Sequence, residues 1–233
     1  MADQGAITVV GFKWVPDFAK GQVRDHRVRW ALREVGWNYD VELIDGAHMT
    51  TPAYRAEHPF GQVPIMREEG RATLFESGGI VLDIAERSGK LLPIDADNRA
   101  LAQCWTYAAL NSVEPFLMQL FFADMVIEDK AVAEGYRPVA ERFARDRLEK
   151  LSAALGEREW LVGGDFSIAD LMMASVSKVS ENTGIVDEFG NLAAWRERCF
   201  ARPAFRETMA EQLAEYERHG PKDMGFDGDP TGK

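Results

Sequence analysis

The sequence has few cysteines, no long apolar run and too few basic residues to balance its acids. Its two cysteines, Cys104 and Cys199, lie far apart, and neither has a partner at the spacing of a disulfide framework, a redox motif or a zinc site. No apolar run reaches the roughly 18 to 20 residues that a membrane-spanning helix needs. The first five residues also lack the basic and then apolar pattern of a signal peptide. We therefore expect a cytoplasmic protein with no metal, in which both cysteines are packing residues.

The shortage of basic residues limits the classes of partner. Lys and Arg number 27 against 38 Asp and Glu, which gives a formal net charge of -11. Such a charge repels phosphate backbones and anionic lipid surfaces, so we expect neither nucleic acid nor a membrane as a partner. With 233 residues and 46% hydrophobic content, the chain can build one large core or two small ones. Small molecules or proteins are the favoured partners, and two compact domains are the favoured organisation.

The N-terminal part of the chain alternates between strand and helix patterns. Residues 7–12 are rich in β-formers, residues 23–36 place apolar side chains at helical spacing, and residues 38–45 alternate like a half-buried strand. Two more short strands form a predicted hairpin around residues 68–70, and a helix over residues 77–89 follows. This order predicts a small α/β domain over the first 88 residues.

Strand patterns stop after this domain, and long helical patterns take over. We expect a linker over residues 89–98, an all-helical domain over residues 99–219 and a mobile tail over residues 220–233, which are rich in Gly, Pro and Asp. Pro115 should kink the first long helix of the second domain rather than end it. Ser167 with Asp170 three residues later predicts a capping box at a helix start.

Three short motifs occur in the order that one family uses. They are "HPFGQVPIM" from residue 58, "LFESGGIVLDIAERSG" from residue 74 and the Ser167–Asp170 box inside "WLVGGDFSIADLMMAS". Together, on a chain of this length, they resemble the cytosolic glutathione transferases over nearly the whole sequence. The resemblance implies a thioredoxin-like α/β N-terminal domain, with a cis bond before Pro64, followed by an all-α helical C-terminal domain.

The same resemblance implies a glutathione site in the N-terminal domain. Glu76 would balance the ammonium of the γ-glutamyl end, while Ser77 and the free amides of its helix would bind the carboxylate. From the residues alone, Ser77 could equally cap its own helix and Glu76 could be a solvated acid of the first turn. The remaining expected contacts are the Val63 backbone before Pro64, paired with the cysteinyl residue as an added strand, then Gln62 and His48 near the glycyl carboxylate, and Trp14.

The residue that would ionise the glutathione thiol does not follow the family pattern. A free thiol has a pKa near 8.5, and family members commonly lower it with a Tyr, Ser or Cys after the first strand. Residues 13–24, "KWVPDFAKGQVR", contain none of these, and residues 15–21 look like an insertion. The substitutes are Gln22 as an amide donor, Arg24 as a fixed cation, and Lys13 at the strand end. Mixed-disulfide chemistry is disfavoured because no cysteine stands there.

A pocket for the second substrate is expected along the first long helix of the C-terminal domain, between the two domains. Its candidate lining residues are Trp105, Ala108, Asn111, Phe116 and Phe121. An aromatic-rich helix of this kind is more often simply core. Family members are commonly dimers, so the resemblance also implies a homodimer.

The leading hypothesis is therefore an enzyme that conjugates the glutathione thiolate, as co-substrate, to a small hydrophobic electrophile. A glutathione-dependent peroxidase or thioether lyase is the enzymatic alternative, because the same thiolate serves both reactions. The alternative from another class is a transferase-fold binding or interaction protein with weak or no catalysis. The atypical segment after the first strand favours this last reading, and the retained Val63–Pro64 and Glu76–Ser77 pairs disfavour it.

Overall fold

The computed structural model describes residues 5–225 and divides them into two compact units. The first unit consists of the chain up to Ser88 together with the segment from Pro203 onward, and the second is Gly89–Arg202. No helix among the described residues is both long and apolar enough to cross a membrane.

The first unit contains a mixed four-stranded sheet. Its strands are β1 (Ile7–Phe12), β2 (Asp40–Ile44), β3 (Ile65–Glu68) and β4 (Leu74–Phe75), in the spatial order β2-β1-β3-β4. β1 runs parallel to β2, with Val10 opposite Glu42, and antiparallel to β3, with Thr8 opposite Arg67. β3 and β4 form the hairpin that the sequence predicted, and Gly70 provides the left-handed backbone (φ 78°) that its turn requires.

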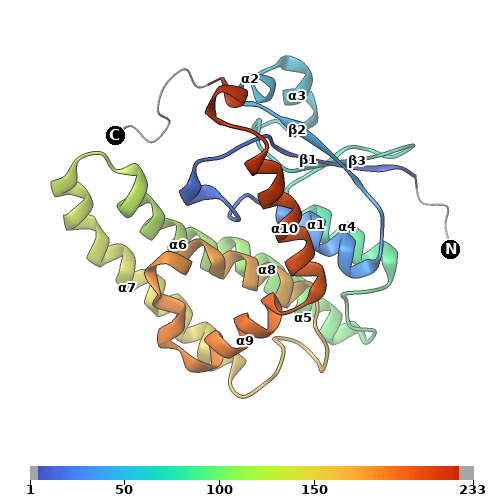
Figure 1. Cartoon of the computed structure of the whole chain (residues 1–233). Coiled ribbons are helices and arrows are strands. Elements are labelled where there is room, and N and C mark those ends of the chain that lie inside the picture. The colour runs from blue at the N-terminus through green and yellow to red at the C-terminus, as the bar shows by residue number, and fades with distance from the viewer. Residues whose placement is uncertain (1–4, 226–233) are drawn as a thin grey trace. The chain divides into compact units, whose positions relative to one another are not determined.

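Helices cover both faces of this sheet (Figure 1). α1 (Asp25–Val35) and α4 (Ser77–Ser88) pack together on one face, and α2 (Gly46–Met49) and α3 (Pro52–Glu57) lie on the other. α1 ends at Gly36, whose φ of 78° places it in the left-handed C-cap conformation expected from the sequence. This arrangement confirms the thioredoxin-like N-terminal domain.

The short helices α2 and α3 were not anticipated from the sequence. Asp45 accepts a hydrogen bond from the His48 amide and caps α2, and Thr51 accepts one from the Tyr54 amide and caps α3. Pro52 occupies the first turn of α3, where its missing N–H costs nothing. Both helices are shorter than two turns, so hydrophobic periodicity does not reveal them. Only their capping residues mark them in the sequence.

The last long helix, α10 (Pro203–Glu217), belongs to the first unit. The domain boundaries expected from the sequence grouped it with the all-helical domain. In the structure Phe205 packs edge-on against the Trp30 ring of α1 with centroids 4.9 Å apart, and the Thr208 hydroxyl lies 3.2 Å from His26 Nε2. The expected mobile tail begins instead with a 3₁₀ turn, Pro221–Met224, whose Met224 side chain is buried. The rest of that tail, residues 226–233, lies outside the described residues.

All regular secondary structure of the second unit, residues 89–202, is helical. Its long helices are α5 (Ala96–Ala108), α6 (Glu114–Phe121), α7 (Lys130–Leu155), α8 (Ile168–Ser177) and α9 (Gly190–Phe200), and two 3₁₀ turns, Lys178–Thr183 and Ile185–Glu188, join α8 to α9. The expected linker is shorter than predicted because Asp95 caps α5, which begins at Ala96. This unit confirms the all-α C-terminal domain.

The break at Pro115 takes the form of a wider helical turn. A π-helical turn, Ala109–Val113, separates α5 from α6, and Pro115 stands in the first turn of α6. Proline removes one backbone donor and its ring crowds the carbonyl four residues earlier, and the π turn accommodates both changes without ending the helical rod. A second π turn, Phe122–Val126, closes α6.

The core of this unit is α8, all of whose residues are buried. It begins with the predicted capping box, in which Ser167 and Asp170 satisfy each other's backbone amides. Asp170 also accepts hydrogen bonds from the Leu161 amide at 2.9 Å and from Trp195 Nε1 at 2.9 Å. One buried carboxylate therefore joins the preceding loop, α8 and α9.

Candidate functional site

The loop before β3 presents an unpaired stretch of backbone. The Val63–Pro64 peptide bond is cis, and the Val63 side chain packs with Val10, Tyr54 and Ile65 in the core of the first unit. The Tyr54 hydroxyl donates to the Gln62 carbonyl at 2.7 Å. Burial raises the pKa of Tyr54 to about 12, so this donor stays protonated. Among residues 5–225 no hydrogen bond engages the backbone of Val63, which leaves it open to an added strand.

The turn from β4 into α4 combines strain with an anion-binding helix start. Glu76 is exposed and has a φ of 69°, a left-handed conformation that is costly for a residue with a side chain. Its carbonyl accepts the first helical hydrogen bond, from the Ile80 amide at 3.0 Å, so Glu76 holds the N-cap position. Ser77 is therefore the first residue inside α4, and the alternative in which it caps its own helix does not describe this geometry.

Ser77 has a partner that sequence reasoning missed. Its hydroxyl oxygen accepts a hydrogen bond from Arg27 Nη1 of α1 at 3.4 Å, and both side chains are buried, at 3% exposure each. Because the oxygen accepts from a guanidinium, the hydroxyl proton is available for donation to a ligand carboxylate. A buried cation beside a helix N-terminus adds to the positive potential there. The basic stretch at residues 26–29 carries a signal for a buried cation, but it lies about fifty residues from Ser77 in the sequence.

The candidate thiol-activating residues lie around the start of α1. Arg24 occupies the N-cap position of α1, and Gln22 stands two residues earlier. The backbone amide of Gln22 donates to the Ala19 carbonyl at 3.0 Å. Val23 between them packs against the core cluster that contains Val63. The two candidates therefore flank a residue that packs against the same core cluster as Val63. Residues 15–21 form a 3₁₀ turn, Asp17–Ala19, and a left-handed Gly21.

Lys13 is engaged elsewhere in the same unit. Its ammonium lies 3.0 Å from Asp45, the residue that caps α2. The His48 amide and then Lys13 hold the pKa of Asp45 below its ordinary value. This pairing draws Lys13 toward the helix that carries His48. Trp14, next in sequence, is half-buried.

The residues expected near the glycyl end are linked through Tyr54. The exposed His48 ring packs edge-on against the Tyr54 ring with centroids 5.4 Å apart, and Tyr54 holds the carbonyl of the exposed Gln62. Each can therefore offer a donor to solvent or to a ligand anion. His58, four residues after Tyr54, is buried, and its ring contacts the Phe75 ring. Burial lowers the pKa of His58.

The expected electrophile-pocket residues are distributed along the α5–α6 rod. Trp105 and Ala108 of α5 are half-buried, Asn111 is exposed in the π turn, and the Phe116 ring of α6 lies under the Arg147 guanidinium of α7 at 4.2 Å. Phe121 pairs with the neighbouring Phe122 ring. Phe116 is thus at least partly a packing residue of the helical unit.

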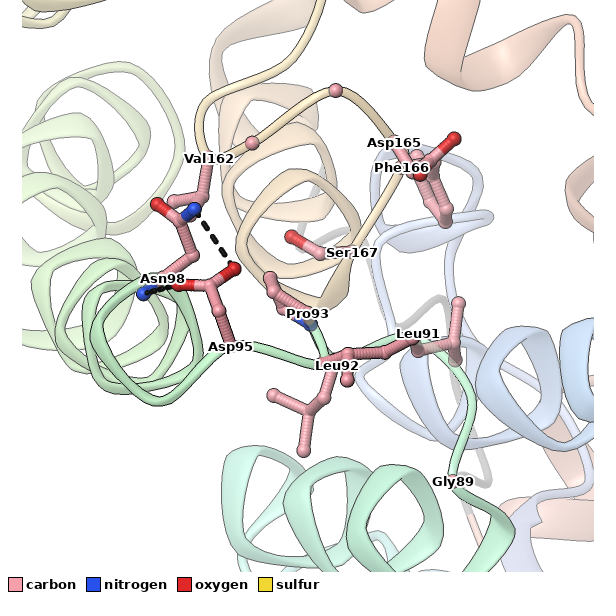
Figure 2. A pocket seen from close by; sticks show the side chains of 13 residues that line it. Gly89, Leu91, Leu92, Pro93, Asp95, Asn98, Val162, Asp165, Phe166 and Ser167 are labelled. Atoms are coloured by element: carbon pink, nitrogen blue, oxygen red, sulfur yellow. Dashed lines mark hydrogen bonds between the residues drawn. The ribbon is translucent and has the colours of Figure 1, made fainter.

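A cavity of about 400 Å³ in the helical unit is formed by other residues (Figure 2). It lies between the segment from Gly89 to Asn98 and the loop from Val162 to Ser167. Asp95 accepts hydrogen bonds from the Asn98 amide and side chain at its edge, as the dashed lines in Figure 2 show. None of the five expected electrophile-pocket residues lines it.

Comparisons with known proteins agree with this architecture. Residues 26–87 match the model of the glutathione S-transferase N-terminal domain, and residues 113–203 match that of the C-terminal domain. Glutathione S-transferase 3 of Zea mays is 32% identical over 201 residues, covering 79% of this chain and 87% of that protein. The chain belongs to the glutathione S-transferase family.

Further glutathione S-transferases are more distant. Glutathione S-transferase F14 of Arabidopsis thaliana is 28% identical over 200 residues, covering 77% of this chain and 76% of that protein. A glutathione transferase of Phanerochaete chrysosporium, solved with oxidized glutathione, has a TM-score of 0.77 at 22% identity, covering 94% of this chain and all of that one. A similarity at that identity supports the fold alone.

The match to the N-terminal glutathione S-transferase domain begins at His26. Val63, Pro64, Glu76 and Ser77 lie inside it, whereas Lys13, Gln22 and Arg24 lie outside it. The segment in which we expect the thiol-activating side chain, residues 13–24, therefore lies before the matched range.

Proposed function

We propose that this family member binds glutathione in its first unit and transfers the glutathione thiolate to a small hydrophobic electrophile. The observation that carries the proposal is the start of α4, where a buried Arg27 supports the Ser77 hydroxyl beside a helix N-terminus. This combination of hydroxyl, cation and helix dipole suits the γ-glutamyl carboxylate. Glu76, exposed next to it, receives the ammonium.

The rest of the tripeptide follows the loop before β3. The cysteinyl backbone pairs with the open backbone of Val63, which brings its sulfur toward Val23 because that residue packs against the same cluster. The glycyl carboxylate reaches Gln62 and His48. Trp14 is a further contact at the end of β1.

The thiol is ionised at the start of α1. Arg24 holds the N-cap position there, so its guanidinium and the positive end of the helix dipole act on the same place. Gln22 adds an amide donor. The electrophile is bound by apolar residues of the α5–α6 rod, among which Trp105 and Ala108 keep part of their surface accessible.

The proposed enzyme works as a homodimer in the cytoplasm. Leu101 and Tyr107 of α5 are 49% and 56% exposed, which supports an apolar face that a second copy covers. Analytical sedimentation of the full chain tests this point: a monomer mass at micromolar concentration contradicts it.

Calorimetric titration with reduced glutathione tests the proposed function directly. The titration is run near pH 7 in two buffers of different ionisation enthalpy, because their difference counts the protons released on binding. Binding with proton release supports thiolate formation, and mass analysis of products then separates a thioether conjugate from the oxidised glutathione of a peroxidase or the products of a lyase. Absence of binding contradicts the proposal.

A binding or interaction protein of this fold is the second candidate. The observation that favours it is the absence of Tyr, Ser and Cys from residues 13–24, where a sulfur partner is expected. Glutathione binding without proton release and without turnover is its signature in the same titration.

A further inference from the structure

Buried polar side chains tie α10 to the first turn of α1. Gln212 Nε2 donates to Asp25 Oδ1 at 2.8 Å and to the Val23 carbonyl at 3.4 Å. Arg29 continues the connection, since its Nε lies 2.8 Å from Asp25 Oδ2 and its Nη2 lies 2.8 Å from Glu215. Gln212, Asp25 and Arg29 are fully buried. These contacts lie within the first unit and join chain segments nearly two hundred positions apart.

The start of α1 lacks the usual means of fixing its own geometry. Its N-cap residue, Arg24, has a helical rather than extended backbone and makes no side-chain capping bond. Ser, Thr, Asp or Asn normally fill this position and bond the amides of the first turn. Gln212, from another helix, adds a side-chain restraint to this turn, beside the local bonds that run from the His26 amide to Val23 and from the Arg27 amide to Arg24.

Val23 is consequently held from two directions. Its side chain packs against the core cluster that contains Val63, and its carbonyl accepts from the His26 amide at 3.3 Å and from Gln212 at 3.4 Å. The residues on either side of it are Gln22 and Arg24. Any shift of this carbonyl moves both of them relative to the loop that carries Val63.

The two ends of the Gln212 side-chain amide differ in their hydrogen bonding. Its amide oxygen is buried and makes no hydrogen bond with any residue between 5 and 225, while its amide nitrogen gives bonds to two acceptors near the start of α1. The hydrogen-bonding capacity of this side chain within residues 5–225 is therefore directed entirely at the start of α1.

We infer that Gln212 is a positioning residue that sets the ionisation of bound glutathione by holding residues 22–24 against the cis-proline loop. The inference rests on the proposed function and assigns α10 a part in it. Gln212 touches neither the sulfur nor the electrophile. It fixes the distance from the sulfur to Arg24, and moving a unit charge from about 4 to about 5 Å weakens its attraction by about a fifth.

The test compares two variants of the full chain that each remove a buried contact between α10 and α1. Gln212→Met keeps the length and removes the amide. Thr208→Val, one turn earlier, removes the hydroxyl that lies 3.2 Å from His26 Nε2, and Thr208 itself makes no hydrogen bond to Val23. The readouts are the pH midpoint of thiolate absorbance for bound glutathione, the glutathione dissociation constant and the melting temperature.

We expect Gln212→Met to raise the midpoint by about half a unit to one unit. Its kcat/KM should fall most below the midpoint and approach the wild-type value at alkaline pH, while the dissociation constant changes less than about threefold. Thr208→Val should lower the melting temperature and leave the midpoint in place.

Equal loss of melting temperature in both variants with an unmoved midpoint overturns the inference and leaves the proposed function standing. Wild-type protein that binds glutathione only as the thiol overturns both. If Gln212→Met does not fold, Gln212→Asn keeps the amide but shortens its reach, and its midpoint must rise as well, since an unchanged value in that variant refutes the positioning role.

Discussion

Replacing Asp170 with alanine should be among the most damaging single substitutions in the helical unit. The carboxylate is fully buried and accepts hydrogen bonds from the Leu161 amide (2.9 Å), the Ser167 amide (3.2 Å), the Ser167 hydroxyl (3.3 Å) and Trp195 Nε1 (2.9 Å). Alanine leaves these donors without an acceptor in the buried surroundings of the start of α8.

The magnitude follows from two opposing effects. Each buried donor that loses its acceptor costs about 1 to 3 kcal/mol, less where the Ser167 hydroxyl can turn to another partner. Against this, the wild type carries the cost of burying a charge, and burial raises the pKa of Asp170 despite its hydrogen bonds. We therefore expect a net loss of about 3 to 5 kcal/mol for Asp170→Ala. Asp170→Asn should lower the free energy of unfolding by about 1 to 3 kcal/mol. One side-chain oxygen remains as an acceptor, whereas the NH₂ group that replaces the other oxygen faces a hydrogen-bond donor.

Urea unfolding of the full chain at pH 7, followed by circular dichroism, measures both losses. Asp165→Ala is the matched control, since that carboxyl is exposed on the loop that precedes α8. A loss below about 1 kcal/mol for Asp170→Ala, or one no greater than that of the control, refutes the reasoning.

Three further changes test other parts of the first unit. Ser77→Ala should weaken glutathione binding about tenfold to a hundredfold, which is the value of one charge-assisted hydrogen bond. If calorimetry shows an unchanged dissociation constant, Ser77 does not contact glutathione. Gly11→Ala places a Cβ 2.9 Å from Asp25 Oδ2 and 3.0 Å from Arg29 Nη2. Urea unfolding should therefore show that the free energy of unfolding falls by about 1 to 3 kcal/mol. An unchanged free energy of unfolding means that the buried Asp25–Arg29 pair can move to make room. Burial lowers the pKa of His58 below 6.5, so its contribution to stability is present above pH 6.5 and is lost as the pH falls through the lowered value. His58→Asn should accordingly flatten the decline in unfolding free energy between about pH 7 and pH 5, and an equal slope in both proteins speaks against this residue.

The parts of the fold that the sequence predicted are those that local chemistry decides. Strand β1, the end of α1 at Gly36 and the capping box of α8 follow from periodicity and from residues that favour one backbone conformation. The short helices α2 and α3 escaped prediction because only their caps, Asp45 and Thr51, carry a signal.

The candidate site divides in the same way. The Val63–Pro64 and Glu76–Ser77 pairs are contiguous motifs, so the sequence could point to them. The contact of Arg27 with Ser77, the pairing of Lys13 with Asp45 and the attachment of α10 to α1 join residues distant in sequence, and no periodicity encodes such contacts. The thiol activator stays a prediction because the family's usual side chains are absent from that segment.

The position of α10 has a consequence for synthesis of the chain. Asp25 and Arg29 emerge from the ribosome early, but their partners Gln212 and Glu215 are made only after the entire helical unit. Until then, the face of α1 that α10 covers exposes Trp30 and two buried charges to solvent or to chaperones. The helical unit is contiguous and can fold first, so the unit encoded first is expected to be completed last.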